Sequence, residues 1–488
     1  MKIYKVSPIV KYSPFFELTY VSRFEFAKGD VVQIDFNRKK IYGVVLEKYD
    51  LKDAKVEIRK ADFQTKKIES KDILKDNNGS GKNGVFSAQQ FKSLFQFSQD
   101  WGIPLGEVIF YLFGEDVDTT VNVFTKMFKF EDGEIIIPDF SFEKYRLLNA
   151  PHISRLHLFF LWLEFFHSSP GQGTKIIIES DFLGVAEKIF LNDCKKIKIE
   201  IVEKKSIVKK YLVNLKEGEI INDETIEKVK NGKTFVFVLS NGYADRIYCN
   251  DCKKSYDCEN CGHAYSLINE ENERYLFCKN CKSKKVLKED QYVICKNCGS
   301  WRIFPFGTGV QKVKELFPDF NIGGIKELNK FLIKKEIFDN VIVASLGPLV
   351  KGKYFDSDEK LIYLLSKLEN ISKNIYINKR SGDEISLQNF KDKEKFIKEE
   401  IILREKLNLP PFVKVVSLIS NYKNKKFVDK FLLTDIEKFK TSGEIKKGNK
   451  YIYYWFVKKD IYEFARNMRG FGEVIVANTI IESSFSKG

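Results

Sequence analysis

The chain has 488 residues and a net charge of +15, with 43% hydrophobic and 31% charged residues, which is typical of a folded globular protein of three or four domains. Its longest apolar stretch, residues 156–166, contains a glutamate and is too short to span a bilayer, so it predicts a buried helix instead. The basic surplus favours a polyanionic partner such as nucleic acid, and a lysine-rich genomic composition explains it equally well.

The first 70 residues predict a small β-rich unit, because apolar and polar residues alternate and a basic turn follows residues 28–36. Basic side chains here are candidates for contacts with DNA phosphates. They are Arg38, Lys39, Lys40 and Lys60. An ordinary solvated surface is the alternative, since lysine is mostly exposed in any protein. A polar segment at residues 75–84 then predicts a linker.

Helical periodicity begins at Ser87, and a second short helix is expected over residues 105–113. Residues 145–240 alternate between helical and strand patterns. The apolar runs at residues 175–178 and 234–239 are typical of buried parallel strands.

The α/β pattern resumes at residues 340–344 after a cysteine-rich segment, and a lysine-rich helix over residues 390–407 leads into a final α+β piece. The predicted fold class is therefore multidomain α/β. It has a β-rich N-terminal domain, an α/β centre that carries the cysteine-rich insertion, and a C-terminal α+β domain.

Four Cys-x-x-Cys pairs define that insertion. They are Cys249/Cys252, Cys258/Cys261, Cys278/Cys281 and Cys295/Cys298. Two residues between the cysteines let both thiolates face one tetrahedral ion, so the four pairs supply the ligands of two zinc sites. The gaps between the pairs are too short for an independent apolar core, and the segment is expected to fold because it binds metal. We predict two Zn²⁺ ions as cofactors.

A disulfide framework fits these cysteines poorly. Disulfide-dense domains are small and secreted, whereas this long chain has nine cysteines and shows no signal peptide. Free thiolates held as zinc ligands indicate a reducing milieu, so we expect a cytoplasmic protein without a membrane partner. A redox role for one pair is the smaller alternative. The ninth cysteine, Cys194, is isolated and is expected to be inert.

Further segments on both sides of the cysteine pairs carry recognisable sequence. They are residues 237–244 before the pairs, 298–300, 306–309 and 316–318 after them, 399–412 near the end, and 18–20, 29, 36, 43–45 and 101–108 near the start. Together with the pairs, these segments resemble the primosomal protein N′ (PriA) family of replication-restart helicases. Of all these features, the cysteine array alone is specific enough to stand by itself.

The resemblance implies a domain division. Residues 1–115 would form a domain like that family's 3′-end DNA-binding domain, and residues 116–234 a truncated first helicase lobe. Residues 235–390 would form a second lobe with the zinc module, residues 249–300, inserted, and residues 391–488 the C-terminal domain. The resemblance also implies nested metal sites, with the outer two pairs on one ion and the inner two on the other. Spacing alone leaves sequential pairing open.

The groups that an ATP-driven motor needs are missing where the family carries them. A phosphate cradle requires a Gly-rich loop, a lysine and a Ser or Thr hydroxyl. Residues 149–156 contain no glycine, and Arg155 and Leu156 replace the lysine and the hydroxyl. Ile371 and Asn374 replace two arginines that the family uses on the γ-phosphate. Since losing one such arginine typically costs about 10³ to 10⁵ in rate, we predict negligible turnover.

No other residues present a convincing catalytic set. Residues 79–82 read Gly-Ser-Gly-Lys but lack the rest of a P-loop, and the acids Asp223 and Glu224 lack a preceding apolar strand. The histidines are His152, His157, His167 and His263. His152 and His157 miss the i, i+4 spacing of a helical metal pair, and His263 is expected to hydrogen-bond at a knuckle rather than serve as a spare ligand.

The leading hypothesis is a non-enzymatic, zinc-containing DNA-binding protein. The resemblance implies forked or single-stranded DNA and primosome proteins as partners in replication restart. The alternatives are an active 3′–5′ helicase with an unrecognised ATP site, and a zinc-scaffolded protein-interaction factor. Tyr256, Tyr265 and Tyr275 are expected to pack around the zinc sites, with stacking on unpaired bases as the alternative.

Overall fold

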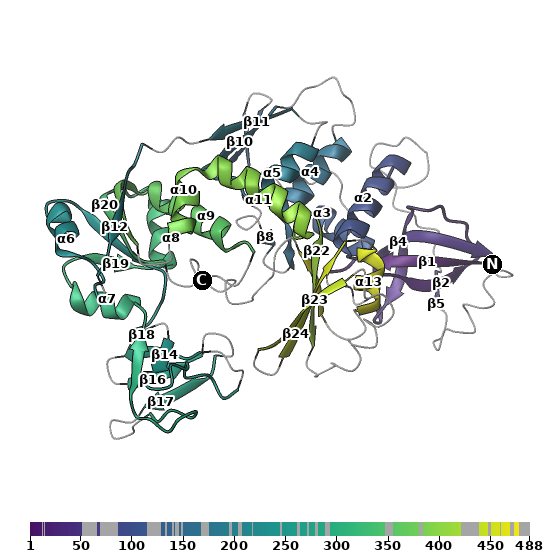
Figure 1. Cartoon of the computed structure of the whole chain (residues 1–488). Coiled ribbons are helices and arrows are strands. Elements are labelled where there is room, and N and C mark those ends of the chain that lie inside the picture. The colour runs from purple at the N-terminus through teal and green to yellow at the C-terminus, as the bar shows by residue number, and fades with distance from the viewer. Residues whose placement is uncertain are drawn as a thin grey trace.

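The computed structural model is a multidomain mixed α/β protein (Figure 1). The structure describes residues 1–11, 13, 15–50, 66–68, 86–114, 128–131, 134–138, 141, 146–147, 150–166, 175–194, 198–203, 207–216, 218–244, 246–260, 264–270, 273–278, 282–287, 293–346, 355–379, 384–420, 439–447, 450–458, 460–468 and 473–477. The linker predicted at residues 75–84 lies outside these ranges.

The N-terminal residues form the predicted β-rich unit. Its strands are β1 (Lys2–Pro8), β2 (Leu18–Ser22), β3 (Val31–Phe36), β4 (Lys39–Asp50) and β5 (Lys66–Lys67), in the order β3-β4-β1-β2-β5. The tight β3–β4 turn places Asn37 and Arg38 at φ values of 49° and 64°. A two-residue hairpin turn of this kind matches the twist of its strands, and asparagine tolerates the left-handed conformation well.

Both predicted helices follow, as α2 (Ala88–Trp101) and α3 (Leu105–Phe113). Ser87 and Gln90 form a reciprocal capping box at the start of α2. The backbone N–H of Gly106 donates to Ser7 Oγ at 3.0 Å. A Cβ at Gly106 would lie 2.1 Å from the carbonyl oxygen of Pro8, so only glycine lets α3 approach β1 this closely.

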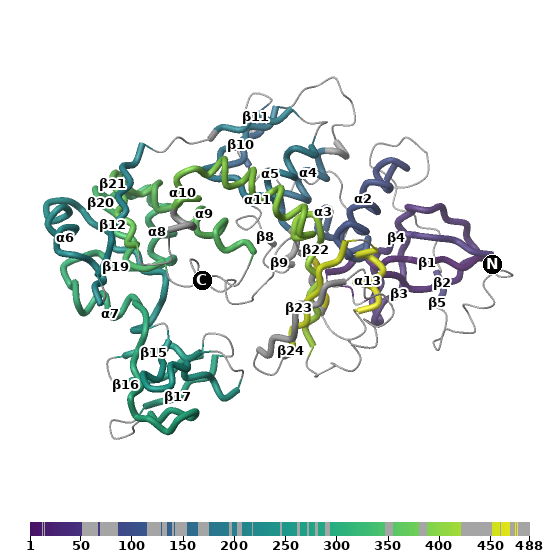
Figure 2. The backbone as a smooth tube through the Cα atoms, in the orientation of Figure 1, coloured from purple at the N-terminus to yellow at the C-terminus, as the bar shows by residue number. Residues whose placement is uncertain are grey.

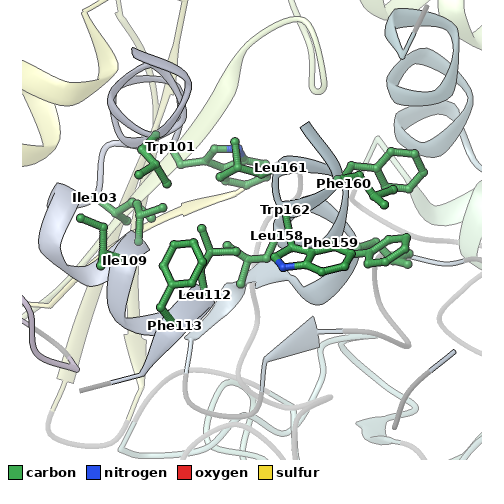
Figure 3. Packing of buried hydrophobic residues seen from close by; sticks show 14 of the residues in the cluster. Trp101, Ile103, Ile109, Leu112, Phe113, Leu158, Phe159, Phe160, Leu161 and Trp162 are labelled. Atoms are coloured by element: carbon green, nitrogen blue, oxygen red, sulfur yellow. The ribbon is translucent and has the colours of Figure 1, made fainter. Parts of the chain in front are cut away.

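The first central sheet has the order β11-β10-β7-β6, and β10 runs parallel to both of its neighbours. Its strands are β6 (Lys129–Glu131), β7 (Glu134–Pro138), β10 (Lys175–Ser180) and β11 (Lys198–Glu203). A small hairpin of β8 (Arg146–Leu147) and β9 (Ala150–Ser154) leads into α4 (Arg155–Phe166). The predicted burial of this apolar helix is confirmed: Figure 3 shows Leu158, Phe159 and Trp162 of α4 packed with Trp101 and Phe113. After β10 comes α5 (Val185–Asp193).

The second central sheet is parallel throughout, with the order β12-β21-β20-β13-β19. Its strands are β12 (Lys209–Asn214), β13 (Thr234–Val238), β19 (Asn321–Gly323), β20 (Phe338–Ser345) and β21 (Ser372–Lys379). Its helices are α6 (Asp223–Val229), α7 (Val310–Leu316), α8 (Ile325–Lys334), α9 (Ser357–Glu369), α10 (Glu384–Lys391) and α11 (Lys393–Leu407). Because β12 belongs to this sheet, the boundary predicted at residue 234 falls inside it.

The C-terminal residues form an antiparallel sheet in the order β23-β24-β22-β25. Its elements are β22 (Lys414–Ser420), β23 (Phe439–Lys447), β24 (Lys450–Val457), α13 (Ile461–Met468) and β25 (Glu473–Ala477). Helix α13 lies against α2 and brings this sheet to the N-terminal side of the molecule (Figure 2). Within the described ranges, no helix combines the length and the apolar character needed to cross a membrane.

Candidate metal centre

The cysteine segment folds as a separate module between β13 and β19. Its strands are β14 (Arg246–Cys249), β15 (Ser266–Glu270), β16 (Glu273–Phe277), β17 (Lys284–Leu287) and β18 (Ile303–Phe306), and it projects from the second sheet (Figure 1). Two anchors hold it there. The N–H groups of Tyr243 and Ala244 donate to the Leu267 carbonyl, and the Gln311 side chain bonds to both backbone polar groups of Asn269.

Three of the cysteine pairs begin with the same turn. The N–H of Cys249, Cys278 or Cys295 donates to the carbonyl five residues further on, at 2.8–2.9 Å. The N–H four residues further on donates back to the cysteine carbonyl at 2.8–3.0 Å. That fourth residue is Lys253, Lys282 or Gly299, each at positive φ. The repetition shows that the two-residue spacing gives the same local turn at each of these three pairs.

The first and last pairs come together. The Sγ atoms of Cys249, Cys252, Cys295 and Cys298 all lie within 4.8 Å of one another. Two of the separations, Cys249–Cys298 and Cys252–Cys295, are 3.6 Å. A Zn–S bond of about 2.3 Å places the sulfurs of a tetrahedral site about 3.8 Å apart. The four sulfurs of the outer pairs therefore have the spacing of a four-thiolate metal site.

The electrostatics of this cluster favour a cation. The amide of Lys254 lowers the pKa of Cys252 to about 6, and the amide of Cys252 lowers the pKa of Cys249. The Ser300 amide likewise acts to lower the pKa of Cys298, but burial and the three neighbouring sulfurs together raise it to about 12. Four adjacent sulfurs cannot all ionise unless a positive charge offsets their repulsion, and metal binding displaces the remaining protons.

The inner pairs are described only in part. Cys258 and Cys278 are buried in the module core, while Cys261, Cys281 and His263 lie outside the described residues. Cys258 Sγ lies 3.2 Å from the hydroxyl of Ser283, which belongs to the turn of the third knuckle. The second and third knuckles are thus neighbours, as a shared second site requires.

The module's aromatic residues divide into two groups. Tyr256, Tyr265 and Tyr275 are at most 7% exposed. Tyr256 and Tyr265 share a hydrophobic cluster with Cys258 and Cys278, as predicted, whereas the Tyr275 hydroxyl donates to Glu270 at 2.7 Å. The sequence reasoning missed a second group, Trp301, Phe304 and Phe306, which are 72%, 47% and 55% exposed.

Register explains why part of this second group shares one surface. Strand β14 pairs with β18 so that Arg246 lies opposite Phe306 and Tyr248 lies opposite Phe304, on one face of the ribbon. The rings of Tyr248 and Phe306 meet edge to face at 5.6 Å. We call Arg246, Tyr248, Phe304 and Phe306 together the aromatic ribbon. The alternation of residues 303–306 could have indicated it, but only the pairing with β14 shows which face is exposed.

A hollow of about 560 Å³ opens beside the sulfur cluster and is lined by Cys249, Lys254, Ser255, Tyr256, Asp257, Cys295, Lys296 and Asn297. Lys254 donates to Asn297 at 2.8 Å, and Lys296 lies 5.6 Å from the Tyr256 ring. The hollow is thus partly basic.

The basic candidates in the N-terminal sheet lie far from this module. Arg38, Lys39 and Lys40 are exposed at the β3–β4 turn, and Figure 1 places that sheet and the cysteine module at opposite ends of the molecule. Lys60 lies outside the described residues. The structure therefore does not bring the DNA and metal candidates into one site.

The position expected for a phosphate cradle is closed. Strand β9 ends at Ser154 and α4 begins at Arg155, with no loop between them. The Leu156 N–H donates to Ser154 Oγ at 3.2 Å, and the Leu156 side chain is fully buried. No backbone loop at this point is available to wrap around phosphates.

Several other residues considered in the sequence occupy ordinary structural positions. Ile371 is buried in the core, and the Asn374 amide donates to the Asp339 carbonyl at 3.0 Å. Asp223 and Glu224 occupy the first turn of α6, where acids complement the helix dipole. The described cysteine outside the module, Cys194, ends α5 and packs against the core.

His157 is buried between Trp101 and Phe190, at ring distances of 4.6 and 5.0 Å. Burial lowers its pKa well below the ordinary value, and the charge of Lys414 adds to this effect. A neutral histidine between two aromatic rings is a packing residue. The side chain of His152 and all of His167 lie outside the described part of the chain.

Comparison with known proteins gives one informative relative. No family model matches the chain. The replication restart protein PriA of Borreliella burgdorferi is 26% identical over 345 residues, which cover 61% of this chain and 51% of that protein. The match therefore spans about half the length of that relative. Together with the cysteine geometry, this similarity supports a divergent relationship between the chain and PriA.

Proposed function

We propose that the chain is a zinc-containing DNA-binding protein that acts in replication restart at forked or single-stranded DNA, without ATP-driven unwinding. The observation that carries the proposal is the cluster of four sulfurs within 4.8 Å in a relative of PriA. The closed β9–α4 junction supports the absence of a motor.

Zinc has a structural role in this proposal. Cys249, Cys252, Cys295 and Cys298 would hold one ion. The inner pairs, Cys258, Cys261, Cys278 and Cys281, would hold a second. Each ion would close two knuckles and so define the small core of the module, because binding and folding share one free energy. All four ligands of each site come from the chain, as in structural rather than catalytic zinc sites.

Two surfaces are suited to contact DNA. Arg38, Lys39 and Lys40, with Lys60, would pair with phosphates near the N-terminal sheet. At the other end of the molecule, the aromatic ribbon combines exposed rings with the cation Arg246. Bases of unpaired strands stack on such rings whatever their sequence, while basic groups follow the backbone.

A second candidate function is a protein-interaction factor, favoured by the exposed apolar rings of Trp301, Phe304 and Phe306. Such rings also occur at the centres of protein interfaces. The two functions differ in their response to salt, because phosphate contacts release counterions and make the affinity fall steeply as salt rises.

The test is fork-DNA binding by the zinc-loaded full chain across a salt series, with and without ATP. We expect a steep slope that ATP does not change. Replacing Arg38, Lys39 and Lys40 by glutamine should reduce the slope by up to about 3, since each lost phosphate contact removes about 0.9. The matched control replaces three lysines on α8, Lys326, Lys330 and Lys334, and should leave the slope unchanged. An undetectable or salt-independent affinity would leave only the protein-interaction function.

A further inference from the structure

The two central sheets are in contact. Residues that directly follow a strand of the first sheet pack into the hydrophobic core of the second sheet. Phe182 and Val185 follow β10 of the first sheet, yet both are buried in the hydrophobic cluster of the second sheet and its helices. That cluster includes Leu361 and Leu365 of α9. An apolar core therefore continues across the boundary between the sheets.

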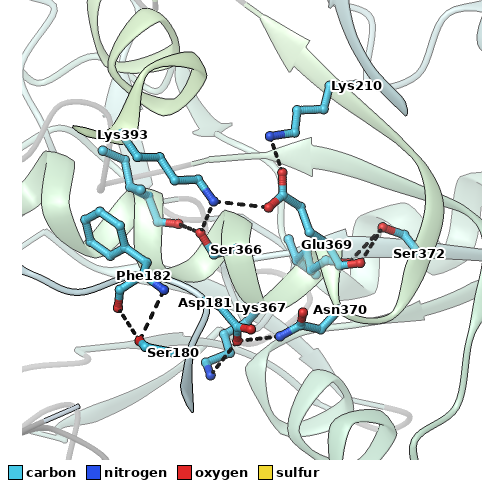
Figure 4. A network of polar contacts seen from close by, with 12 residues as sticks. Ser180, Asp181, Phe182, Lys210, Ser366, Lys367, Glu369, Asn370, Ser372 and Lys393 are labelled. Carbon is cyan, nitrogen blue, oxygen red and sulfur yellow. Dashed lines mark hydrogen bonds and ion pairs between the residues drawn. The ribbon is translucent and has the colours of Figure 1, made fainter. Parts of the chain in front are cut away.

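Polar contacts cross the same boundary. Asp181, directly after β10, accepts hydrogen bonds from Lys367 at 3.3 Å and from Asn370 at 2.5 Å, both at the end of α9 (Figure 4). The side chains of Asp181 and Lys367 are only 10% and 11% exposed. These partners are 186 and 189 residues apart in sequence.

A second contact lies at the start of α5. Glu359 of α9 accepts from the Val185 N–H at 2.9 Å and from Arg404 at 2.6 Å. Arg404 is 2% exposed and also donates to Glu400 at 2.8 Å. Burial raises the pKa of Glu359, while Arg404 opposes that change.

Gly184 shows how close this approach is. A Cβ at Gly184 would lie 2.0 Å from Glu359 Oε1 and 2.7 Å from Glu187 Oε2. Any larger residue would have to push the carboxylate of Glu359 away from the start of α5. The backbone conformation of Gly184 suits any residue, so a side chain here is opposed only by the contact with the Glu359 carboxylate.

The last turn of α9 is fixed from its other side as well. Glu369 forms ion pairs with Lys210 of β12 and with Lys393 of α11, the latter at 3.1 Å, and Lys393 also donates to Ser366 at 2.7 Å (Figure 4). Lys367 and Asn370, which hold Asp181, adjoin Glu369 in sequence. The segment that bonds to the first sheet is therefore itself locked into the second.

Separating the sheets would expose the apolar contacts of Phe182 and Val185. It would also part Asp181 from its cation Lys367 and the Val185 N–H from Glu359. A buried charge that loses its partner is strongly unfavourable. Joints that open are instead drawn from weakly packed, solvated parts of a structure.

We propose that the two central sheets form one fixed body, fastened by the contacts of Asp181, Gly184 and Glu359, and that nucleotide does not change their separation. The consequence, which rests on the proposed function, is that the N-terminal sheet and the aromatic ribbon are presented to DNA at a constant distance. The chain would act as a rigid spacer between its two DNA-contacting surfaces.

The experiment is hydrogen–deuterium exchange of the zinc-loaded full chain, alone, with ATP and Mg²⁺, with a non-hydrolysable ATP analogue, and with fork DNA. Peptides covering α5 and α9 report on the joint. We expect their exchange rates to change by less than about twofold in every nucleotide arm, as for any amide whose opening equilibrium is unperturbed. A larger change with nucleotide would overturn the proposal.

Variants give the complementary test. Gly184→Ala should speed exchange in α5 and α9 about tenfold, because the displaced Glu359 carboxylate loses its hydrogen bond with the Val185 N–H. Lys367→Met is a milder second variant that keeps the side-chain length and removes the charge, and it should speed exchange in the same two helices. Unchanged exchange rates of α5 and α9 in both variants would contradict the proposal that these contacts fasten the two sheets. The control, Lys228→Met, removes an exposed pair with Glu224 and should change neither helix.

These outcomes are independent of DNA binding. A chain that fails to bind forks would refute the proposed function, while its exchange with nucleotide would still report on the joint. A chain that binds forks but alters α5 and α9 on adding ATP would refute the fixed joint alone.

Discussion

The cysteine module and the β9–α4 junction differ in whether they present the geometry of a binding site. The module brings four sulfurs within 4.8 Å on short hydrogen-bonded turns, whereas the junction runs from strand to helix without a loop and buries Leu156. A thiolate site needs only a few ligands on short local turns, and a small module can supply them all. A nucleotide site needs a specific loop and parts that move relative to one another. The four described cysteines thus have the geometry of a metal site, whereas the junction lacks the loop of a nucleotide site.

The largest expected effect concerns the cysteine module. Treating the chain with a strong chelator should remove all metal and unfold the module, since a structural zinc contributes about 10 to 16 kcal/mol of binding free energy. Replacing Cys298 by serine should remove the outer ion alone and loosen the two outer turns. The zinc content measured by metal analysis should fall from about two ions per chain to about one in Cys298→Ser. The control is Cys194→Ser, which should keep both ions. Two zinc ions still bound in Cys298→Ser would contradict the assignment of Cys298 as a metal ligand.

The next effect concerns the joint beside the closed junction. Arg404→Met leaves Glu359 and Glu400 buried without their cation and should lower the free energy of unfolding by about 3 to 5 kcal/mol. Denaturant unfolding measures the loss. The exposed pair of Lys228 and Glu224 provides the control, because Lys228→Met should leave the free energy of unfolding nearly unchanged. Equal losses in the two variants would show that the joint carries no special stability.

A hydroxyl introduced at Leu156 tests whether the β9–α4 junction can hold phosphate. Leu156→Thr places a hydroxyl in a fully buried position and should destabilise the chain by about 2 to 4 kcal/mol without producing ATP turnover. Leu156→Met, which conserves volume, should cost less than about 1.5 kcal/mol. Thermal unfolding and phosphate release check the two expectations. Turnover gained by the threonine variant would show that the junction can still hold phosphates.

The smallest predicted effect depends on pH and tests the packing around α4. Burial lowers the pKa of Lys414 to about 8, and its ammonium lies 4.1 Å from the centre of the Trp101 ring. Between pH 8 and about 10.5 the unfolded chain binds this proton more tightly than the folded chain, so the contribution of Lys414 to stability rises with pH. The rise is at most about 3 kcal/mol.

Urea unfolding of the parent chain and of Lys414→Met at pH 7 to 10 measures this contribution. The parent should gain stability relative to the variant from pH 8 upward. Below pH 8 the difference between the two should be constant. Parallel curves across the whole range would show that the lysine is not buried as described.

Local signals in the sequence predicted most single elements. The helix after Ser87, the apolar helix α4 and the parallel strands β10 and β13 each carry a strong period or an apolar run. The spacing of the cysteine pairs predicted the knuckles for the same reason, because the three described turns, at Cys249, Cys278 and Cys295, are closed by hydrogen bonds within six residues.

Long-range pairings could not be predicted in this way. The addition of β12 to the second sheet depends on its pairing with β21, more than 150 residues later. The contact of Asp181 with Lys367 joins residues 186 apart. The exposed face of Phe304 depends on register with Tyr248. None of these features leaves a local pattern in the sequence, since each is decided by which elements pack together.

The most direct test of the account is strand displacement on forked DNA by the zinc-loaded full chain, measured at a concentration that saturates binding. We predict bound forks and no displaced strand above the level seen without ATP, because no group at the β9–α4 junction holds phosphate. ATP-dependent displacement that is abolished by Arg155→Ala would contradict the account, because it would place a working nucleotide site at the junction described as closed.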